Sequence, residues 1–464
     1  MSAILLFAIL AFSFQPAGGT TPSFDVVVVG AGPGGIAAAI QASRDGARVL
    51  LLEETDWIGG QMTAAGVSTM DAGKEVQQHP FGLYAEFVQR LQDHYRRLGK
   101  SIGTCYWNET QVCFEPRVGQ LILKDMLAEA GVTVRTLTTV TGVLLDGKSI
   151  HGLRTTRGEV LAPAVVDATE WGDVLGLLPG SYRLGAEIQD ITWLAIIKRY
   201  PDGVPAELVM HEPPGYKPDD FRESLTLEGS GSNWPRPGIR YPVSWNFHNH
   251  YRGLPDSSNP RNYTGWHGAT TKTGVNWFND YTITPEAVTD RVVRREQTCQ
   301  AKLKTLRLLY YIQTEIDSRW AVANDEGYDT PFNRNWACWP GFEDIEANMP
   351  VIPYVREARR LVGVETLLAD GVRHPDGGGV AWGDYRIDLH GGRGALDFSE
   401  TWDDTDRGGS VFGVPAGAFV SAVYRGLFAT EKNISTSRLA AGATRLGPVA
   451  FSLGEAAGSL AAGR

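Results

Sequence analysis

The chain has 464 residues, which is enough to bury a large core and suggests two or three domains. Its formal net charge of −10 argues against nucleic acid or an anionic membrane as a partner, because both favour a basic face. Its four cysteines are too few for a disulfide scaffold and show no CxxC spacing, so neither a redox dithiol nor a metal site is expected.

The N-terminal segment resembles a secretory signal. Residues 4–12 form an apolar run and small residues follow at 17–19, although no Lys or Arg precedes the run. The run is too short to span a bilayer, so no integral membrane segment is expected. The pattern favours a signal peptide over residues 1–20 and a secreted or periplasmic protein, against a start-site artefact or a cytoplasmic N-terminal tail. In an exported protein Cys105 and Cys113 could close a disulfide loop; two free buried thiols are the alternative.

Residues 24–53 join a buried strand, a glycine turn, a helix and a second strand that ends in an acid. Gly30 permits a tight turn, Gly32 lets the backbone approach a pyrophosphate, and Gly35 allows the helix to pack closely on its strand. Glu53 is placed to accept hydrogen bonds from an adenosine ribose. The order predicts a dinucleotide site at the helix N-terminus, and an ordinary βα turn is the alternative.

The next segments continue an α/β pattern. Paired glycines at 59–60 suit a backbone that passes close to a ligand. We expect a helix over residues 118–130 and then a three-stranded meander, with turns at Asp146-Gly147 and Arg157-Gly158. A return strand over residues 164–169 ends in small residues, where open α/β sheets place ligands.

Residues 182–349 differ in character, with long irregular segments and a helix expected over residues 285–314. We interpret this part as a substrate-covering domain inserted into the nucleotide-binding domain. A loop-rich structural cap is the alternative. The segment contains Trp193, Trp234, Trp245, Trp266 and Trp277, and for most of these tryptophans we favour a position in the core over contact with a ligand. Regular elements return from about residue 350 and end in a helix over residues 449–462, with Pro448 at its first turn.

The chain after Thr21 resembles the FAD-dependent oxidoreductase family, with its glutathione-reductase-type FAD fold. Five stretches carry the resemblance: GAGPGG at 30–35, EETDWIGGQ at 53–61, VVDATEWGD at 165–173 with YRLG at 182–185, VREARR at 355–360 with GDYRIDLH at 383–390, and RLGPVAFSLG at 445–454. The resemblance implies an α/β fold whose Rossmann-type FAD-binding domain is built from both chain ends, residues 24–181 and 350–464. An α+β substrate domain, residues 182–349, is inserted between them.

The resemblance also implies the cofactor contacts. Carried over by position, the predicted FAD-binding residues are Gly30, Gly32, Pro33, Gly34, Gly35, Glu53, Glu54, Gly59, Gly60, Gln61, Val140, Ala168, Gly447, Pro448 and Val449. Val140 would offer backbone groups to adenine, and the turn at 447–449 would face the isoalloxazine. A helix N-terminus at that turn stabilises the negative charge of a reduced flavin.

Flavin dehydrogenation needs a group that takes the substrate proton. We predict His390 for this role, with Asp388 as an orienting partner if the backbone between them is not a plain strand. A structural histidine is the alternative, and His79 is a weaker candidate base. Arg356, in a segment with Glu357, Arg359 and Arg360, could bind a substrate carboxylate, and ion pairing within that segment is the alternative.

Missing motifs narrow the enzyme class. No second dinucleotide fingerprint and no CxxxxC or CxxC dithiol is present, which disfavours pyridine-nucleotide-disulfide reductases. The sequence therefore predicts an FAD enzyme that removes a hydride from a small or medium organic substrate and passes the electrons to oxygen or another acceptor. The alternatives are a flavin monooxygenase and a non-catalytic flavin-binding protein. The sequence does not predict the substrate or the oligomeric state.

Overall fold

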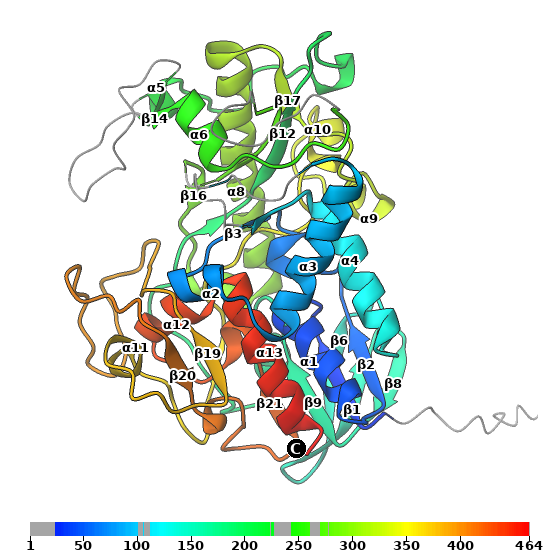
Figure 1. The fold of residues 1–464 in the computed structure, drawn as a ribbon, viewed down its shortest axis with the longest axis vertical. Helices are drawn as coiled ribbons and strands as arrows, with labels where there is room; N and C mark the ends of the chain where they lie inside the picture. The colour runs from blue at the N-terminus through cyan, green and yellow to red at the C-terminus, as the bar shows by residue number, and fades with distance from the viewer. Residues whose placement is uncertain are drawn as a thin grey trace, which may run out of the picture.

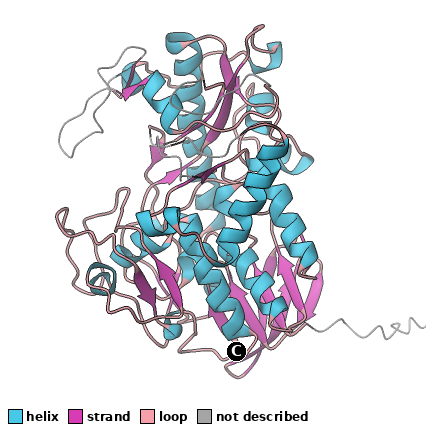
Figure 2. Cartoon of the chain, viewed as in Figure 1, coloured by secondary structure: helices cyan, strands magenta, loops and turns pink. Residues whose placement is uncertain are grey.

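The computed structural model describes residues 24–100, 105, 112–222, 224–226, 243–259, 270–276 and 278–463. The predicted signal peptide at 1–20 lies outside this range. Both ends of the described chain meet in the lower half of the molecule, while β12, β17 and α8 occupy the upper half (Figure 1; secondary structure in Figure 2).

A five-stranded parallel sheet forms the base of the fold. Its strands, in spatial order, are β21 (Leu427–Ala429), β9 (Ala164–Asp167), β1 (Val26–Val29), β2 (Val49–Leu52) and β5 (Thr133–Arg135). β1 and β2 are wholly apolar, as expected for strands buried on both faces. Because β21 comes from the C-terminal part, both chain ends build this sheet, and the predicted α/β fold is confirmed.

Two helices of small residues pack tightly beside the sheet: α1 (Pro33–Arg44) and α13 (Gly447–Ala461). A Cβ on Gly454 of α13 would lie 2.2 Å from the carbonyl oxygen of Gly34, and one on Gly458 would lie 2.4 Å from that of Ala38. Only glycine permits this close approach of two backbones. α13 begins two residues before the start predicted for it.

The predicted elements between Glu53 and Asp167 are present. α4 spans Pro116–Glu129, and the antiparallel meander consists of β6 (Val140–Asp146), β7 (Ser149–Thr155) and β8 (Gly158–Leu161). The meander leads directly into β9, as the sequence predicted.

The middle of the chain has a second core. β12 (Ala195–Arg199) pairs antiparallel with β15 (Lys272–Val275) and β17 (Trp320–Val322), and α8 (Arg291–Tyr311) lies beside this sheet (Figure 1). The apolar cluster between Trp171 and Val355 is separate from the cluster around the parallel sheet. The bounds of an inserted domain at 182–349 stay a prediction.

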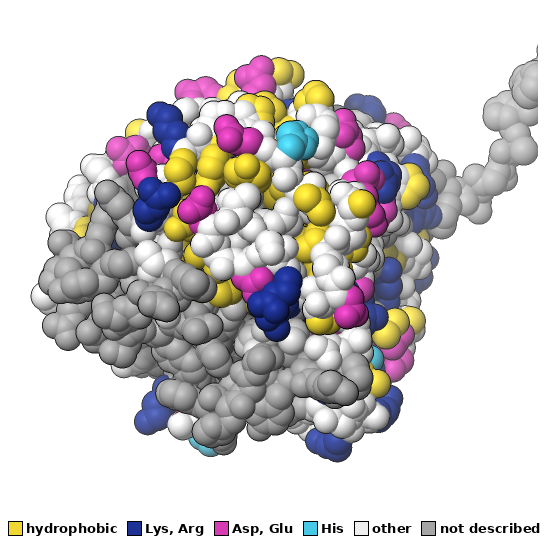
Figure 3. Space-filling model, turned by 90° about the horizontal axis from the view of Figure 1, so that it is seen from above, with side chains coloured by type: hydrophobic (Ala, Val, Ile, Leu, Met, Phe, Trp, Pro, Cys, Tyr) yellow, Lys and Arg dark blue, Asp and Glu magenta, His cyan; other side chains and the backbone are white. Residues whose placement is uncertain are grey.

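The tryptophans of this part contribute to its core. Trp193 and Trp245 are buried in the second cluster, whereas Trp234, Trp266 and Trp277 lie outside the described residues. On the upper face the described acidic and basic side chains are interspersed among apolar ones (Figure 3).

The prediction of a single helix at 285–314 was wrong in one respect, because this segment forms two helices. α7 (Pro285–Thr289) ends before Asp290, α8 follows, and a π-helical turn over Ile312–Ile316 extends it. Asp290 has extended backbone angles, and its side chain accepts hydrogen bonds from the N–H groups of Val292 and Val293. An N-cap of this kind starts a new helix.

Both cysteine pairs form disulfides, Cys105–Cys113 and Cys299–Cys338. The first resolves the alternatives that the sequence left open, and the second was not predicted, since 39 residues separate the two cysteines. Within the described residues, no helix is both long and apolar enough to cross a membrane, and no acidic, histidine and cysteine side chains gather as a metal site.

Apart from one helix of 16 residues, α3, the remaining elements are short. They are β3 (Thr69–Met70), α2 (Lys74–Gln78), α3 (Gly82–Arg97), β4 (Val112–Cys113), β10 (Tyr182–Arg183), β11 (Ile191–Thr192), α5 (Asp219–Arg222), β13 (Leu225–Thr226), β14 (Val243–Ser244), α6 (Trp245–Tyr251), β16 (Asp280–Tyr281), α9 (Pro331–Asn335), α10 (Glu343–Ala347), β18 (Arg360–Leu361), α11 (Ala369–Arg373), β19 (Ala381–Gly383), β20 (Phe412–Val414) and α12 (Arg438–Thr444), with 3₁₀ turns η1 (Gly60–Met62), η2 (Leu175–Leu177), η3 (Ala206–Leu208), η5 (Ala416–Ala418) and η6 (Glu431–Asn433).

Candidate active site

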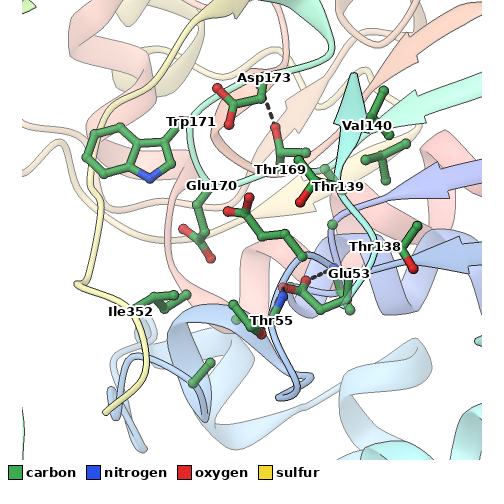
Figure 4. A pocket seen from close by; sticks show the side chains of 18 of the residues that line it. Glu53, Thr55, Thr138, Thr139, Val140, Thr169, Glu170, Trp171, Asp173 and Ile352 are labelled. Atoms are coloured by element: carbon green, nitrogen blue, oxygen red, sulfur yellow. Dashed lines mark hydrogen bonds between the residues drawn. The ribbon is translucent and has the colours of Figure 1, made fainter. Parts of the chain in front are cut away.

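A cleft opens at the carboxyl ends of β1, β2 and β9. The side chains that line it include Glu53 and Thr55 after β2, residues 138–140 at the start of β6, and Ile352 (Figure 4). Thr169, Glu170, Trp171 and Asp173, which follow β9, line it as well (Figure 4). This is the edge of the sheet where open α/β folds bind ligands.

Glu53 is held at the edge of the cleft. One carboxylate oxygen accepts a hydrogen bond of 2.8 Å from the N–H of Ala31, and the other accepts bonds of 2.9 Å from the N–H and the hydroxyl of Thr55. Burial raises the pKa of Glu53 to about 7. The side chain is only partly covered, so the carboxyl still faces the cleft.

The floor of the cleft is a cradle that only glycine can form. Gly30 has a φ of +98°, and a Cβ there would lie 2.3 Å from the carbonyl oxygen of Ala168. A Cβ on Gly60, in η1, would lie 2.6 Å from the Cα of Gly32. The two predicted glycine segments therefore lie against each other, and the backbone there is open to a ligand.

The structure brings most predicted cofactor positions to this region. Those that line the cleft are Gly30, Gly32, Glu53, Glu54, Gly60, Val140 and Ala168. Pro33, Gly34, Gly35 and Gly59 are buried in the turns beneath it.

A second cavity, of about 390 Å³, lies at the N-terminus of α13. Gln61 and Gly447 are among its lining residues, and the side-chain amide of Gln61 donates a hydrogen bond of 2.9 Å to the carbonyl oxygen of Arg445. Pro448 and Val449 are buried in the first turn of α13, behind Gly447. Since Gly60 lines the first cleft and Gln61 the second, one ligand could extend along η1 from one to the other.

His390 lines the second cavity between two carboxylates. Its Nδ1 lies 2.7 Å from Asp280 Oδ2, and its Nε2 lies 3.3 Å from Asp388 Oδ2. The backbone at 384–390 is not a strand, which is the condition under which Asp388 was expected beside His390. Burial opposes ionisation of Asp280, but Arg356 and His390 hold its pKa well below the usual range.

Asp388 is fixed by two arginines as well as by His390. Arg407 and Arg445 each donate a hydrogen bond of 2.9 Å to its carboxylate. Against the effect of burial, His390 and Arg445 hold the pKa of Asp388 well below its usual range, so this carboxylate is ionised at neutral pH. Arg445 is buried and also donates to the hydroxyl of Tyr354.

Arg356 lines the cavity, but its charge is already paired. Its Nη1 donates to the carbonyl oxygen of Asp190 at 2.7 Å, and its Nη2 donates to Asp280 Oδ1 at 3.0 Å. The other charged residues of its segment mostly pair with distant partners: Glu357 with Arg438, Arg359 with Asp173, and Arg360 with Asp397. Ion pairing is thus extensive, but it mostly connects this segment to other parts of the fold.

Several residues in or next to the second cavity were not predicted from the sequence. Asp280 precedes His390 by 110 positions, and no local pattern marks it. Arg445 stands in the RLGP stretch that supported the resemblance, so its position was available but its role was not assigned. Arg386 lines the cavity, is exposed, and has no ion-pair partner among the described residues. His79, the weaker candidate base, lines a separate pocket beside Trp382.

The comparison with protein families decides the class. The model of the FAD dependent oxidoreductase family matches residues 25–463. The chain belongs to this family. It is therefore an oxidoreductase, and FAD is its cofactor. The residues present fit FAD, because the glycine cradle and Glu53 suit the adenosine diphosphate half, and Gly447 at the N-terminus of α13 lines the second cavity.

Similarity to individual proteins is confined to parts of the chain. Digeranylgeranylglycerophospholipid reductase of Methanocella arvoryzae is 30% identical over 132 residues, which are 28% of this chain and 34% of that protein. Sarcosine oxidase subunit alpha of Corynebacterium sp. is 57% identical over 47 residues, 10% of this chain and 5% of that one. The chain thus spans about a third or less of the curated relatives that it matches.

Solved structures match at low identity. L-proline dehydrogenase from P. horikoshii is 16% identical, with 39% of this chain and 62% of that chain covered and a TM-score of 0.30. Glycine oxidase from Bacillus cereus is 14% identical, with 40% of this chain and 65% of that chain covered and a TM-score of 0.28.

Proposed function

We propose that this oxidoreductase removes a hydride from a small or medium organic substrate bound in the second cavity, and that the electrons pass to oxygen or another acceptor. The observation that carries the proposal is His390, which lines a cavity at the N-terminus of α13 and lies between two ionised carboxylates. When bound, FAD supplies the hydride acceptor.

Different residues of the chain would bind the two halves of FAD. The glycine cradle and Glu53 bind the adenosine diphosphate half, and Gln61 and Gly447 border the flavin half. The N-terminus of α13 favours negative charge beside it, because its first N–H groups have no helical partner.

The proton would be taken by His390 at Nε2. Asp280 holds Nδ1 at 2.7 Å and so fixes the ring, while the contact from Nε2 to Asp388 is longer, at 3.3 Å. Nε2 is therefore the more weakly held of the two nitrogens and takes the proton while the ring is neutral, and the two carboxylates stabilise the imidazolium that results. Arg356 would act through Asp280 as a positioning residue, since both of its Nη groups are occupied.

Substrate recognition would fall to Arg386. Five arginines line the second cavity, Arg252, Arg356, Arg386, Arg407 and Arg445, against two aspartates, Asp71 and Asp388. An excess of positive charge favours an organic anion, and Arg386 is the exposed one of the five. A carboxylate is the simplest group that it would bind in two-point fashion.

A substrate screen under anaerobic conditions, with flavin bleaching as the readout, tests the proposed reaction. His390→Ala should leave FAD occupancy unchanged and slow flavin reduction by about 100-fold, the scale of a positioned acid or base. His79→Ala is the matched control, because His79 lies in a separate pocket, and its rate should equal that of the wild type. If no organic substrate bleaches the flavin, or if His390→Ala lowers only the melting temperature, the assignment is wrong.

A further inference from the structure

The N-terminus of α1 holds a carboxylate that a dinucleotide site does not require. Glu431 belongs to η6, after β21, and its side chain is buried. Its Oε1 accepts a hydrogen bond of 2.6 Å from the N–H of Gly34, and the N–H of Gly35 is also directed to this carboxylate. Because Pro33 has no N–H, these are the first donors that the helix can offer to an anion.

Glu431 lies directly against the glycine turn. A Cβ on Gly32 would be 2.5 Å from Glu431 Oε1. The N-terminus of the helix after such a turn is where a dinucleotide pyrophosphate binds, since the free N–H groups and the macrodipole favour negative charge. The carboxylate of Glu431 and the pyrophosphate of FAD would therefore use the same donors.

The carboxylate is poorly compensated where it lies. Glu431 has a φ of 59°, in the left-handed region that few non-glycine residues adopt. Its Oε2 is buried and has no hydrogen-bond partner among the described residues. Lys432 Nζ is 3.9 Å from this oxygen but only 2.6 Å from the carboxylate of Glu170. A second anion at this helix end would add repulsion to an incompletely paired charge.

We propose that Glu431 competes with FAD for the N-terminus of α1 and must be protonated for FAD to bind tightly. When Glu431 starts ionised, each FAD bound takes up one proton from solvent onto the carboxylate. The protonated carboxyl removes the repulsion and can donate a hydrogen bond to a phosphate oxygen.

The surroundings of Glu431 place this exchange near neutral pH. Burial raises the pKa of Glu431 to about 7, and Glu170 raises it as well, whereas Lys432 and the N–H groups of Gly34 and Gly35 oppose the change. The charged groups that face Glu431 are thus Lys432 on its own element, Glu170 after β9, and the N-terminus of α1. Below this pH the carboxyl is neutral, and above it the repulsion of FAD grows.

The test compares dissociation constants of FAD for the wild type and for Glu431→Gln. Purified holoenzyme is diluted, and free FAD is measured by fluorescence after ultrafiltration, on both sides of pH 7. Glutamine can still accept from Gly34 but cannot ionise. The ratio of wild-type to variant Kd should be constant below about pH 7 and rise about tenfold per pH unit above it, the slope of one coupled proton. A ratio is used because Glu53, which faces the same cleft, also has a pKa raised to about 7.

Glu431→Gly provides a second variant. Glycine suits the left-handed backbone and removes the carboxylate, so the ratio of wild-type to variant Kd should change with pH in the same way as for Glu431→Gln. Glu455→Gln is the matched control, because Glu455 accepts from the N–H of Leu83 at 2.9 Å near the start of α3 and lines neither cavity. A ratio that does not change with pH for either Glu431 variant, or that changes equally for Glu455→Gln, overturns the proposal.

Discussion

Among single residues, Glu53 offers the most specific test of the proposed FAD site. Its carboxyl is fixed by Ala31 and Thr55 at the end of β2, where the adenosine ribose of FAD is expected. Glu53→Ala should raise the Kd of FAD by about tenfold, the effect of losing one charge-assisted hydrogen bond. FMN has no adenosine, so its weaker binding should not change.

The comparison of the two flavins is measured by fluorescence titration of the apoprotein. Equal losses for FAD and FMN would remove Glu53 from ribose recognition. A loss of both together with a lower melting temperature would instead mean that Glu53 supports the glycine turn through Ala31.

Some residues of the site could be predicted from the sequence, and others could not. The glycine positions could be predicted, because a tight turn leaves no room for a side chain and therefore requires glycine. Gly30 is an example, since a Cβ there would clash with the backbone of Ala168. His390 and Asp388 could be paired on the condition of an irregular backbone. Asp280 could not be found, because its contact with His390 joins positions that are 110 residues apart. The contact of the Glu431 carboxylate with the N-terminus of α1 could not be predicted for the same reason, since 397 residues separate Glu431 from Gly34.

At the level of elements, the break between α7 and α8 makes a prediction about stability. Asp290 accepts hydrogen bonds from Val292 and Val293 and thereby satisfies two donors at the start of α8. Asp290→Ala should lower the free energy of unfolding by about 1 kcal/mol, as for other N-cap losses. Asp290→Asn keeps the acceptor and should cost less. Urea unfolding followed by circular dichroism measures both variants, and equal losses would contradict the capping role.

Local patterns predicted elements better than they predicted contacts between elements. The strands at 26–29 and 49–52, the meander and α4 follow from apolar runs and glycine turns. The small residues of α1 and α13 were visible in the sequence, but their direct packing was not. That packing joins the two ends of the chain, which the strand order β21-β9-β1 brings together. The cap at Asp290 was missed because the helical pattern continues on both sides of it.

At the scale of the whole molecule, the described residues form separate apolar clusters around the parallel sheet and in the middle of the chain, and the disulfides connect separate segments. Cys299–Cys338 ties α8 to the segment after α9, and the indole N–H of Trp339 donates to the carbonyl oxygen of Cys299 at 2.9 Å. Disulfides form in oxidising compartments, so the two pairs support the proposal that the segment at 1–20 directs export. Mass spectrometry of protein made in the periplasm should find a chain cleaved near residue 20 that has no free thiol. Full-length chains there would contradict the signal.

The two disulfides should differ in their effect on stability, because they close loops of different length. The sequence separations are 8 residues for Cys105–Cys113 and 39 for Cys299–Cys338. Restricting the unfolded chain contributes about 2.5 kcal/mol for the shorter loop and about 4 kcal/mol for the longer one, if chain entropy dominates. Replacing both cysteines of a pair by serine should therefore lower the melting temperature more for Cys299 and Cys338. Calorimetry of the two double variants, with and without dithiothreitol, measures this difference, and reductant should erase it. The reverse order would mean that contacts of the folded state around Cys105, rather than loop closure, set the contribution of each disulfide.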